Sequence, residues 1–147
     1  MAERFGSLLG SWTGLERLDA SPWGPATTAR ASLVLRLDVD GTVVVQDYRQ
    51  VRADGVELTG HGVFLVEPGT ERMLWWFFDS AAQVPRPAVG AGAAGELVLE
   101  RTTASGSARH RLRADGDRLD HTISIRPDDT ADHQPFLTGT YRRLTGH

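Results

Sequence analysis

The sequence lacks three residue types whose side chains carry much of protein chemistry. It has no cysteine, which excludes disulfides, thiolate metal ligands and a cysteine nucleophile. It has no lysine, so all 16 basic residues are arginine and Schiff-base chemistry is excluded. It has no asparagine and little isoleucine. The abundance of alanine, glycine and arginine in their place indicates a bacterial source with a GC-rich genome, of actinobacterium-like type.

Excess charge and long apolar runs are also missing. A net charge of −3 over 147 residues provides no basic surface for nucleic acid or for an anionic membrane. No apolar run approaches the ~20 residues that a membrane helix needs. The start, MAERFGSLLGSW, has an early acidic residue and no long apolar core, so we expect no secretory signal. These features predict one cytoplasmic domain, residues 1–147, with an ordinary globular composition.

What the sequence contains is a series of strand-like runs separated by turn signals. Asp-Gly pairs at 40–41, 54–55 and 115–116 lie between alternating segments, which is typical of hairpins. The predicted strands cover 11–20, 27–38, 42–52, 56–67, 72–80, 96–103, 107–114, 118–126 and 134–144, with an irregular strand in 88–94. A short helix near residues 2–10 precedes them. Nine or ten sequential antiparallel strands predict an all-β, up-and-down barrel, which closes and so has no free edge. A β-sandwich is the alternative.

Two of the expected hairpins predict which side chains share a face. A two-residue turn at 115–116 places His110 opposite His121 and turns the arginines at 109, 111 and 113 toward solvent. A two-residue turn at 54–55 places Tyr48 opposite His61, and a turn at 68–71 continues that face. The resulting face carries Gln46, Tyr48, His61, Val63, Leu65, Leu74, Trp76 and Phe78. Because the opposite face carries Asp47 and Arg49, we expect the His61 face to be the interior.

The other face of the same strands predicts an assembly. If Trp76 and Phe78 point inward, then Phe64, Trp75 and Phe77 form an apolar patch on the outside. The patch needs a cover, either the segment 84–95 or a second copy of the chain. We expect a homodimer with these three rings in or beside the contact.

Several sequence blocks carry a family resemblance. The stretch LLGSWTGLERL (8–18) contains a Gly-x-Trp-x-Gly first-strand motif. It is followed in order by VVQDYRQ (44–50), GHGVFLVEP (60–68), WWFFDS (75–80) and PFLTGTYRR (135–143). Together, over about residues 5–144, these blocks resemble a bacterial family of lipocalin-like domains of unknown function. That family is related in fold to the fatty-acid-binding proteins and to the haem-binding nitrobindins. The resemblance implies a barrel of about ten strands with a ligand cavity and no established activity.

The resemblance also implies roles for single residues. The first-strand tryptophan of lipocalins packs at the closed end of the barrel under an arginine from the last strand. Here these would be Trp12 and either Arg142 or Arg143, joined by a cation–π contact. Nitrobindins hold ferric haem through a histidine on a C-terminal strand. The matching position here is Phe136, so we expect no haem, and we expect no other cofactor. One histidine, His133, lies three residues upstream of that position.

The leading functional hypothesis is non-catalytic binding of a small, mostly apolar molecule inside the barrel. Aromatic walls with a few polar groups suit such a site. The candidate ligand-binding residues are Gln46, Tyr48, His61, Trp76, Phe78, His110 and His121. One alternative is an isomerase or cyclase in which His61 is the general base and Tyr48 orients it. A further alternative is a nitrobindin-like haem protein.

Two other features of the sequence, a set of histidines and a loop tryptophan, do not change that hypothesis. The three histidines at 61, 110 and 121 lack the spacing typical of zinc ligands, so no metal site is predicted. Trp23, which lies between two prolines, is interpreted as a loop anchor rather than a lid.

Overall fold

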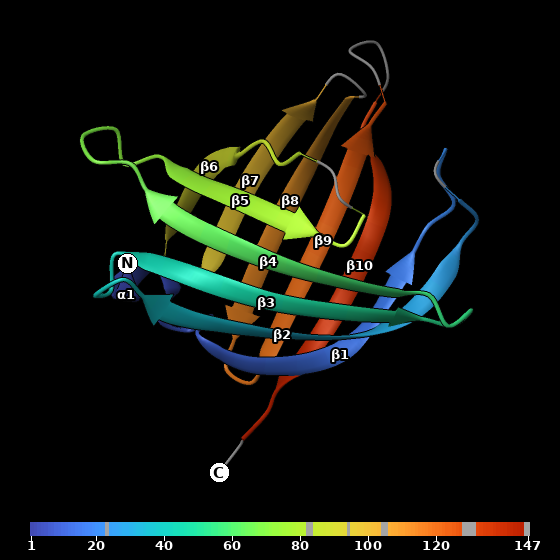
Figure 1. The fold of residues 1–147 in the computed structure, drawn as a ribbon, viewed down its shortest axis with the longest axis horizontal. Coiled ribbons are helices and arrows are strands. Elements are labelled where there is room, and N and C mark those ends of the chain that lie inside the picture. The colour runs from blue at the N-terminus through green and yellow to red at the C-terminus, as the bar shows by residue number, and fades with distance from the viewer. Residues whose placement is uncertain (23, 82–83, 94, 104–105, 128–131, 146–147) are drawn as a thin grey trace.

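The computed structural model describes residues 1–147 except for 23, 82–83, 94, 104–105, 128–131 and 146–147. Within the described residues, ten antiparallel strands close into a barrel in which sequence neighbours pair and β1 pairs with β10 (Figure 1). The elements are α1 (Ala2–Phe5), β1 (Gly10–Leu18), β2 (Thr27–Asp38), β3 (Val43–Arg52), β4 (Glu57–Val66), β5 (Met73–Asp79), β6 (Ala88–Ala93), β7 (Glu96–Thr103), β8 (Gly106–Asp115), β9 (Arg118–Arg126) and β10 (Gln134–Arg143). The prediction of an all-β, lipocalin-like, up-and-down barrel is confirmed. Trp23, interpreted above as an anchor, lies outside the described residues.

The strands alternate buried and exposed side chains, as a barrel with a packed interior requires. In β1, Trp12, Glu16 and Leu18 are buried while Leu15 between them is 66% exposed. Figure 1 shows β2 to β5 crossing the front of the barrel at a steep angle to β7, β8 and β9 behind them. No helix in the described part of the chain is long and apolar enough to cross a membrane.

One end of the barrel is closed by the N-terminal segment. Phe5 of α1 packs edge-on against Phe64, with ring centroids 5.1 Å apart. Trp12 donates from Nε1 to the carbonyl of Leu8 at 2.9 Å. The guanidinium of Arg143 lies 4.2 Å from the centre of the Trp12 ring and also donates to backbone carbonyls of the same segment. The expected contact between a first-strand tryptophan and a last-strand arginine is therefore present.

Of the two arginines proposed for that contact, Arg143 makes it. Arg142 is exposed, because neighbouring residues of β10 point to opposite sides of the wall.

The hairpin between β3 and β4 differs from the prediction by one residue. The loop has three residues, Ala53 to Gly55: the N–H of Arg52 donates to the carbonyl of Val56, and Gly55 has φ +88°. An Asp-Gly pair suits this three-residue loop as well as a two-residue turn, because the glycine takes the left-handed position in both. Tyr48 therefore pairs with Gly60, and Asp47 pairs with His61. A shift of one residue exchanges the two faces of everything beyond it.

Because the two faces are exchanged, the predicted positions of several side chains of β4 and β5 are wrong. The β4–β5 register is as predicted, with Val63 opposite Trp76, so both strands turn over as a unit. His61, Trp76 and Phe78 lie on the outer face, and Phe78 is 51% exposed. Phe64, Trp75 and Phe77 lie on the inner face, where Phe64 and Trp75 are buried. The three rings thus do not form an outer patch, and the dimer contact expected through them has no surface there.

The β8–β9 hairpin is also shifted, but by two residues. Its turn is Gly116–Asp117, so Asp115 pairs with Arg118 and Leu112 pairs with His121. A shift of two residues leaves each side chain on its predicted face. The arginines at 109 and 111 accordingly lie outside, where they form ion pairs with Glu100 and Glu96 of β7.

Candidate functional site

The barrel encloses a cavity of about 220 Å³ at the end away from α1. Its apolar walls are Leu18, Leu33, Leu58, Trp75, Phe77, Leu112, Ile123, Phe136 and Leu137. Its polar lining is Gln46, Tyr48, Gln50, Arg52, Asp79, Arg101, His110 and His121. The cavity thus brings together Gln46, Tyr48, His110 and His121 from the predicted site. It does not include His61, whose Nδ1 lies 2.9 Å from Asp47 Oδ1 on the outer face, nor Trp76 or Phe78.

A buried carboxylate next to this cavity organises its polar wall. Glu16 is only 2% exposed, and its two oxygens accept hydrogen bonds from Tyr48 (2.7 and 2.8 Å), Gln50 (2.7 Å) and Tyr141. Burial, reinforced by the charge of Glu16, raises the pKa of the Tyr48 and Tyr141 hydroxyls above the ordinary value of 10. Both phenols therefore stay protonated as donors, and the carboxylate has the partners that a buried charge requires.

Glu16 was not among the residues predicted from sequence. A signal for it was available, because the two-residue period that starts at the inward-facing Trp12 places residue 16 inside the barrel.

Trp75 forms the aromatic wall of the cavity. It stacks on Phe64 with centroids 5.2 Å apart and an interplanar angle of 2°, and it donates from Nε1 to Gln46 Oε1 at 3.1 Å. Phe77 continues this wall beside Gly60, where an added Cβ would lie 2.1 Å from Cζ of the ring. The glycine of β4 thus gives Phe77 the space it occupies, and the wall is held by stacking, a hydrogen bond and close backbone approach.

The two histidines predicted to line the cavity form a pair. Nδ1 of His110 and Nε2 of His121 are 3.0 Å apart, so one ring donates its N–H to the other. Burial lowers the pKa of His121 to about 4 and, with the nearby charges of His121 and Arg101, lowers that of His110 well below 6.5. Both rings are therefore neutral at pH 7. Among the described residues, no group of three or more histidine, aspartate or glutamate side chains is placed to hold a metal ion.

Two arginines, Arg52 and Arg101, and one aspartate, Asp79, lie at the mouth of the cavity. Arg101 lies over the Trp75 ring with Cζ 5.1 Å from its centroid, and donates from Nε to the carbonyl of Arg86 at 2.9 Å. Its Nη2 is buried and has no hydrogen-bond partner. Burial lowers the pKa of Arg101, and the charge of Asp79 opposes that shift. Arg52 stands on the rim as well, donating from Nε to Gln50 Oε1 at 3.1 Å.

Within the described residues, the backbone pairing of the strands beside Arg101 is incomplete. β5 and β6 pair only from Met73 to Trp75 within the described residues, and β6 pairs with β7 as far as Glu100. The last four residues of β5 and the last three of β7 therefore have no partner in β6. Arg101 lies in that unpaired part of β7, and the carbonyl of Arg86, from the segment before β6, accepts its hydrogen bond there.

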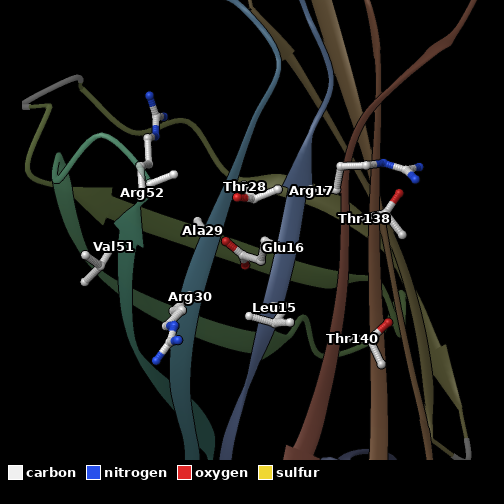
Figure 2. A pocket seen from close by; sticks show the side chains of 11 residues that line it. Leu15, Glu16, Arg17, Thr28, Ala29, Arg30, Val51, Arg52, Thr138 and Thr140 are labelled. Atoms are coloured by element: carbon white, nitrogen blue, oxygen red, sulfur yellow. The ribbon is translucent and has the colours of Figure 1, made fainter.

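A larger hollow of about 660 Å³ lies on the outside of the barrel. Figure 2 shows that its side chains come from four neighbouring strands, β3, β2, β1 and β10. Most are outward-facing positions such as Leu15, Arg30 and Thr140, which are exposed. Its lining includes the buried Glu16, but that carboxylate already accepts hydrogen bonds from Tyr48, Gln50 and Tyr141. The interior cavity, which has aromatic walls and buried polar side chains, is the better candidate for a binding site.

Fold and cavity together define a lipocalin-like barrel. Among solved structures, Rv2717c from M. tuberculosis is similar, with a TM-score of 0.77 and 20% identity over 97% of this chain and 96% of that one. The S-type phycobiliprotein lyase CPES from Guillardia theta is similar with a TM-score of 0.69 and 13% identity, over 97% and 92% of the two chains. At these identities the similarity establishes the fold alone. No protein-family model and no curated protein matches the sequence.

Proposed function

We propose that this protein binds a small, mostly apolar molecule in the barrel cavity and does not transform it. The observation that carries the proposal is the interior cavity, which has Trp75 and Phe77 as its aromatic wall and polar side chains that are largely hydrogen-bonded within the protein. A volume of about 220 Å³ equals that of about seven water molecules at ~30 Å³ each. Since a 150 Å³ apolar cavity in another protein accepts benzene, a compound of one or two rings, or a short chain, has a suitable size. From its composition, we place the protein in the bacterial cytoplasm.

The structure offers little support for a reaction in this cavity. The enzyme hypothesis required His61 and Tyr48 to share a face, but His61 is outside and the Tyr48 hydroxyl donates to Glu16. The histidines that do line the cavity are hydrogen-bonded to each other. Because burial lowers the pKa of both rings below 6.5, either ring is a weak general base at pH 7. Binding without turnover is therefore the function that we propose.

Haem fits this cavity poorly. Phe136, which stands where the nitrobindin resemblance would place the iron-binding histidine, lines the cavity with an apolar ring. The volume of about 220 Å³ lies below the ~300–1,000 Å³ of ordinary ligand pockets, and a porphyrin is a large ligand. We propose a protein without haem, which a single absorption spectrum tests. A Soret band with the position and intensity of bound haem after addition of hemin would contradict it.

Calorimetric titration with neutral one- and two-ring compounds, such as 2-naphthol and 2-naphthamide, tests the binding proposal. Leu58 lines the cavity and is half-buried, whereas the next residue, Thr59, is exposed on the outer face. We expect saturable binding of at least one compound with 1:1 stoichiometry, at least tenfold weaker in Leu58→Trp and unchanged in Thr59→Trp. Absence of saturable heat across the panel, or equal weakening by both variants, would contradict an interior site.

A further inference from the structure

We infer that the molecule bound in the cavity is a carboxylic acid with a small apolar body, and that its carboxylate pairs with the guanidinium of Arg101. This inference rests on the proposed function and specifies the class of ligand. The class of ligand is indicated by the polar groups around the cavity that still have no hydrogen-bond partner.

Most polar groups of the cavity wall are already engaged. The Gln46 oxygen accepts from Trp75, and the Tyr48 hydroxyl donates to Glu16. The Gln50 amide donates to Glu16 and accepts from Arg52. These side chains line the cavity, but they already form hydrogen bonds with other side chains of the protein.

Arg101 is the exception. Its Nη2 is buried without a hydrogen-bond partner, and no carboxylate of the described residues lies within salt-bridge distance of it. By contrast, the exterior arginines at 109 and 111 each have a glutamate partner. A buried donor of a charged group without an acceptor is costly, and an acceptor that enters the site removes that cost. The Trp75 ring and the carbonyl of Arg86 hold the side chain beside the cavity, which limits the conformational freedom that it loses when a ligand binds.

The charges around the mouth favour an anion. Two arginines, Arg52 and Arg101, and one carboxylate, Asp79, line the cavity, and the His110–His121 pair is neutral at pH 7. The carboxylate of Glu16 lies next to the cavity, where three side chains of the protein donate hydrogen bonds to it. A guanidinium presents a planar fork of donors, which matches the two oxygens of a carboxylate. A small turn of the guanidinium toward the ligand would give Nη2 the acceptor it lacks.

The rest of the wall decides what the carboxylate is attached to. Trp75 and Phe77 flank Arg101, and Leu112, Ile123 and other apolar side chains form the remaining lining. A free inorganic anion would leave these surfaces without a partner, whereas an aromatic or short aliphatic body buries them. The geometry therefore fits a compound such as an aromatic monocarboxylate.

The test compares two probes that differ in charge but little in shape. Calorimetry at pH 7.5 measures 2-naphthoate and 2-naphthamide on wild type, Arg101→Gln and the exterior control Arg109→Gln. We expect wild type and the control to bind the carboxylate at least tenfold more tightly than the amide. We expect Arg101→Gln to lose this preference and to bind the two probes with equal affinity.

The outcomes separate the inference from the proposed function. Equal wild-type affinity for the two probes would overturn the carboxylate inference and leave the binding function intact. Binding of neither probe, nor of any compound in the neutral panel, would overturn both. A preference that persists in Arg101→Gln would overturn the assignment to that residue.

A second variant keeps the test decisive if Arg101→Gln does not fold. Asp79 lies near Arg101 and competes electrostatically for its charge. Asp79→Asn removes that competition, so we expect the affinity for 2-naphthoate relative to that for 2-naphthamide to rise by about threefold or more. An unchanged ratio of the two affinities would overturn the inference.

Discussion

Acidification should destabilise this protein through the histidine pair inside its barrel. Burial lowers the pKa of His121 from 6.5 to about 4, and that of His110 also falls well below 6.5. Between these values the unfolded chain binds protons that the folded chain excludes, so stability falls as pH falls. The contribution of the pair is fully present above pH 6.5 and is lost as the pH drops toward the folded pKa.

The size of the effect follows from the shift. For His121 the pKa falls from 6.5 to about 4, and at ~1.4 kcal/mol per unit this amounts to roughly 3 kcal/mol. His110 acts in the same direction, and because the rings are hydrogen-bonded the protons belong to the pair rather than to one ring. Since small domains are stable by only ~5–15 kcal/mol, this loss is a large fraction of the total.

Urea unfolding at pH 7, 6 and 5, followed by tryptophan fluorescence, measures the loss. The variant with both His110→Gln and His121→Gln removes the titrating rings, and His61→Gln on the outer face is the control. We expect wild type and the control to lose at least 1 kcal/mol more than the double variant between pH 7 and pH 5. An equal loss in all three proteins would refute the assignment, because exposed carboxylates would then explain the whole pH dependence.

Three other substitutions test the packing around the site. Glu16→Leu leaves buried donors without an acceptor, so we expect a loss of about 3 kcal/mol or more in urea unfolding. Arg143→Ala removes the cation–π contact with Trp12 and bonds to backbone carbonyls, for an expected loss of about 2 kcal/mol in the same assay. Gly60→Ala pushes its methyl group into Phe77, so we expect a loss of about 1–3 kcal/mol and weaker 2-naphthamide binding by calorimetry. A variant with wild-type stability would contradict the contact that it removes or crowds.

The strand series was predictable because it depends on local signals. Alternation with a period of two and the Asp-Gly pairs placed each predicted strand within two or three residues of the observed one. Which face of a strand points inward depends in addition on whether the preceding loop has an odd or an even number of residues. Here one loop determined the faces of β4 and β5. The loop that ends at Gly55 has three residues instead of two, which turned the predicted interior of β4 and β5 outward.

A second signal in the sequence could have corrected the parity. Gly60 and Gly62 flank His61, so one face of β4 has almost no side-chain volume at two successive positions. Large rings on the neighbouring strand need that space, as the 2.1 Å separation between a Cβ at Gly60 and the Phe77 ring shows. Reading the glycines as room for Phe77 would have placed the Trp75 face inside.

Charged residues inside the barrel are harder to predict, since alternation alone treats them as errors of pattern. Glu16 and Arg101 both occupy inward positions, but the structure gives them different surroundings. Glu16 receives hydrogen bonds from three side chains of the protein, so its charge is complete without a ligand. Arg101 has one backbone carbonyl and an aromatic face, and its remaining buried donor has no acceptor. A sequence shows that both charges are present, but only their contacts distinguish the one that holds the barrel together from the one that is left for a ligand.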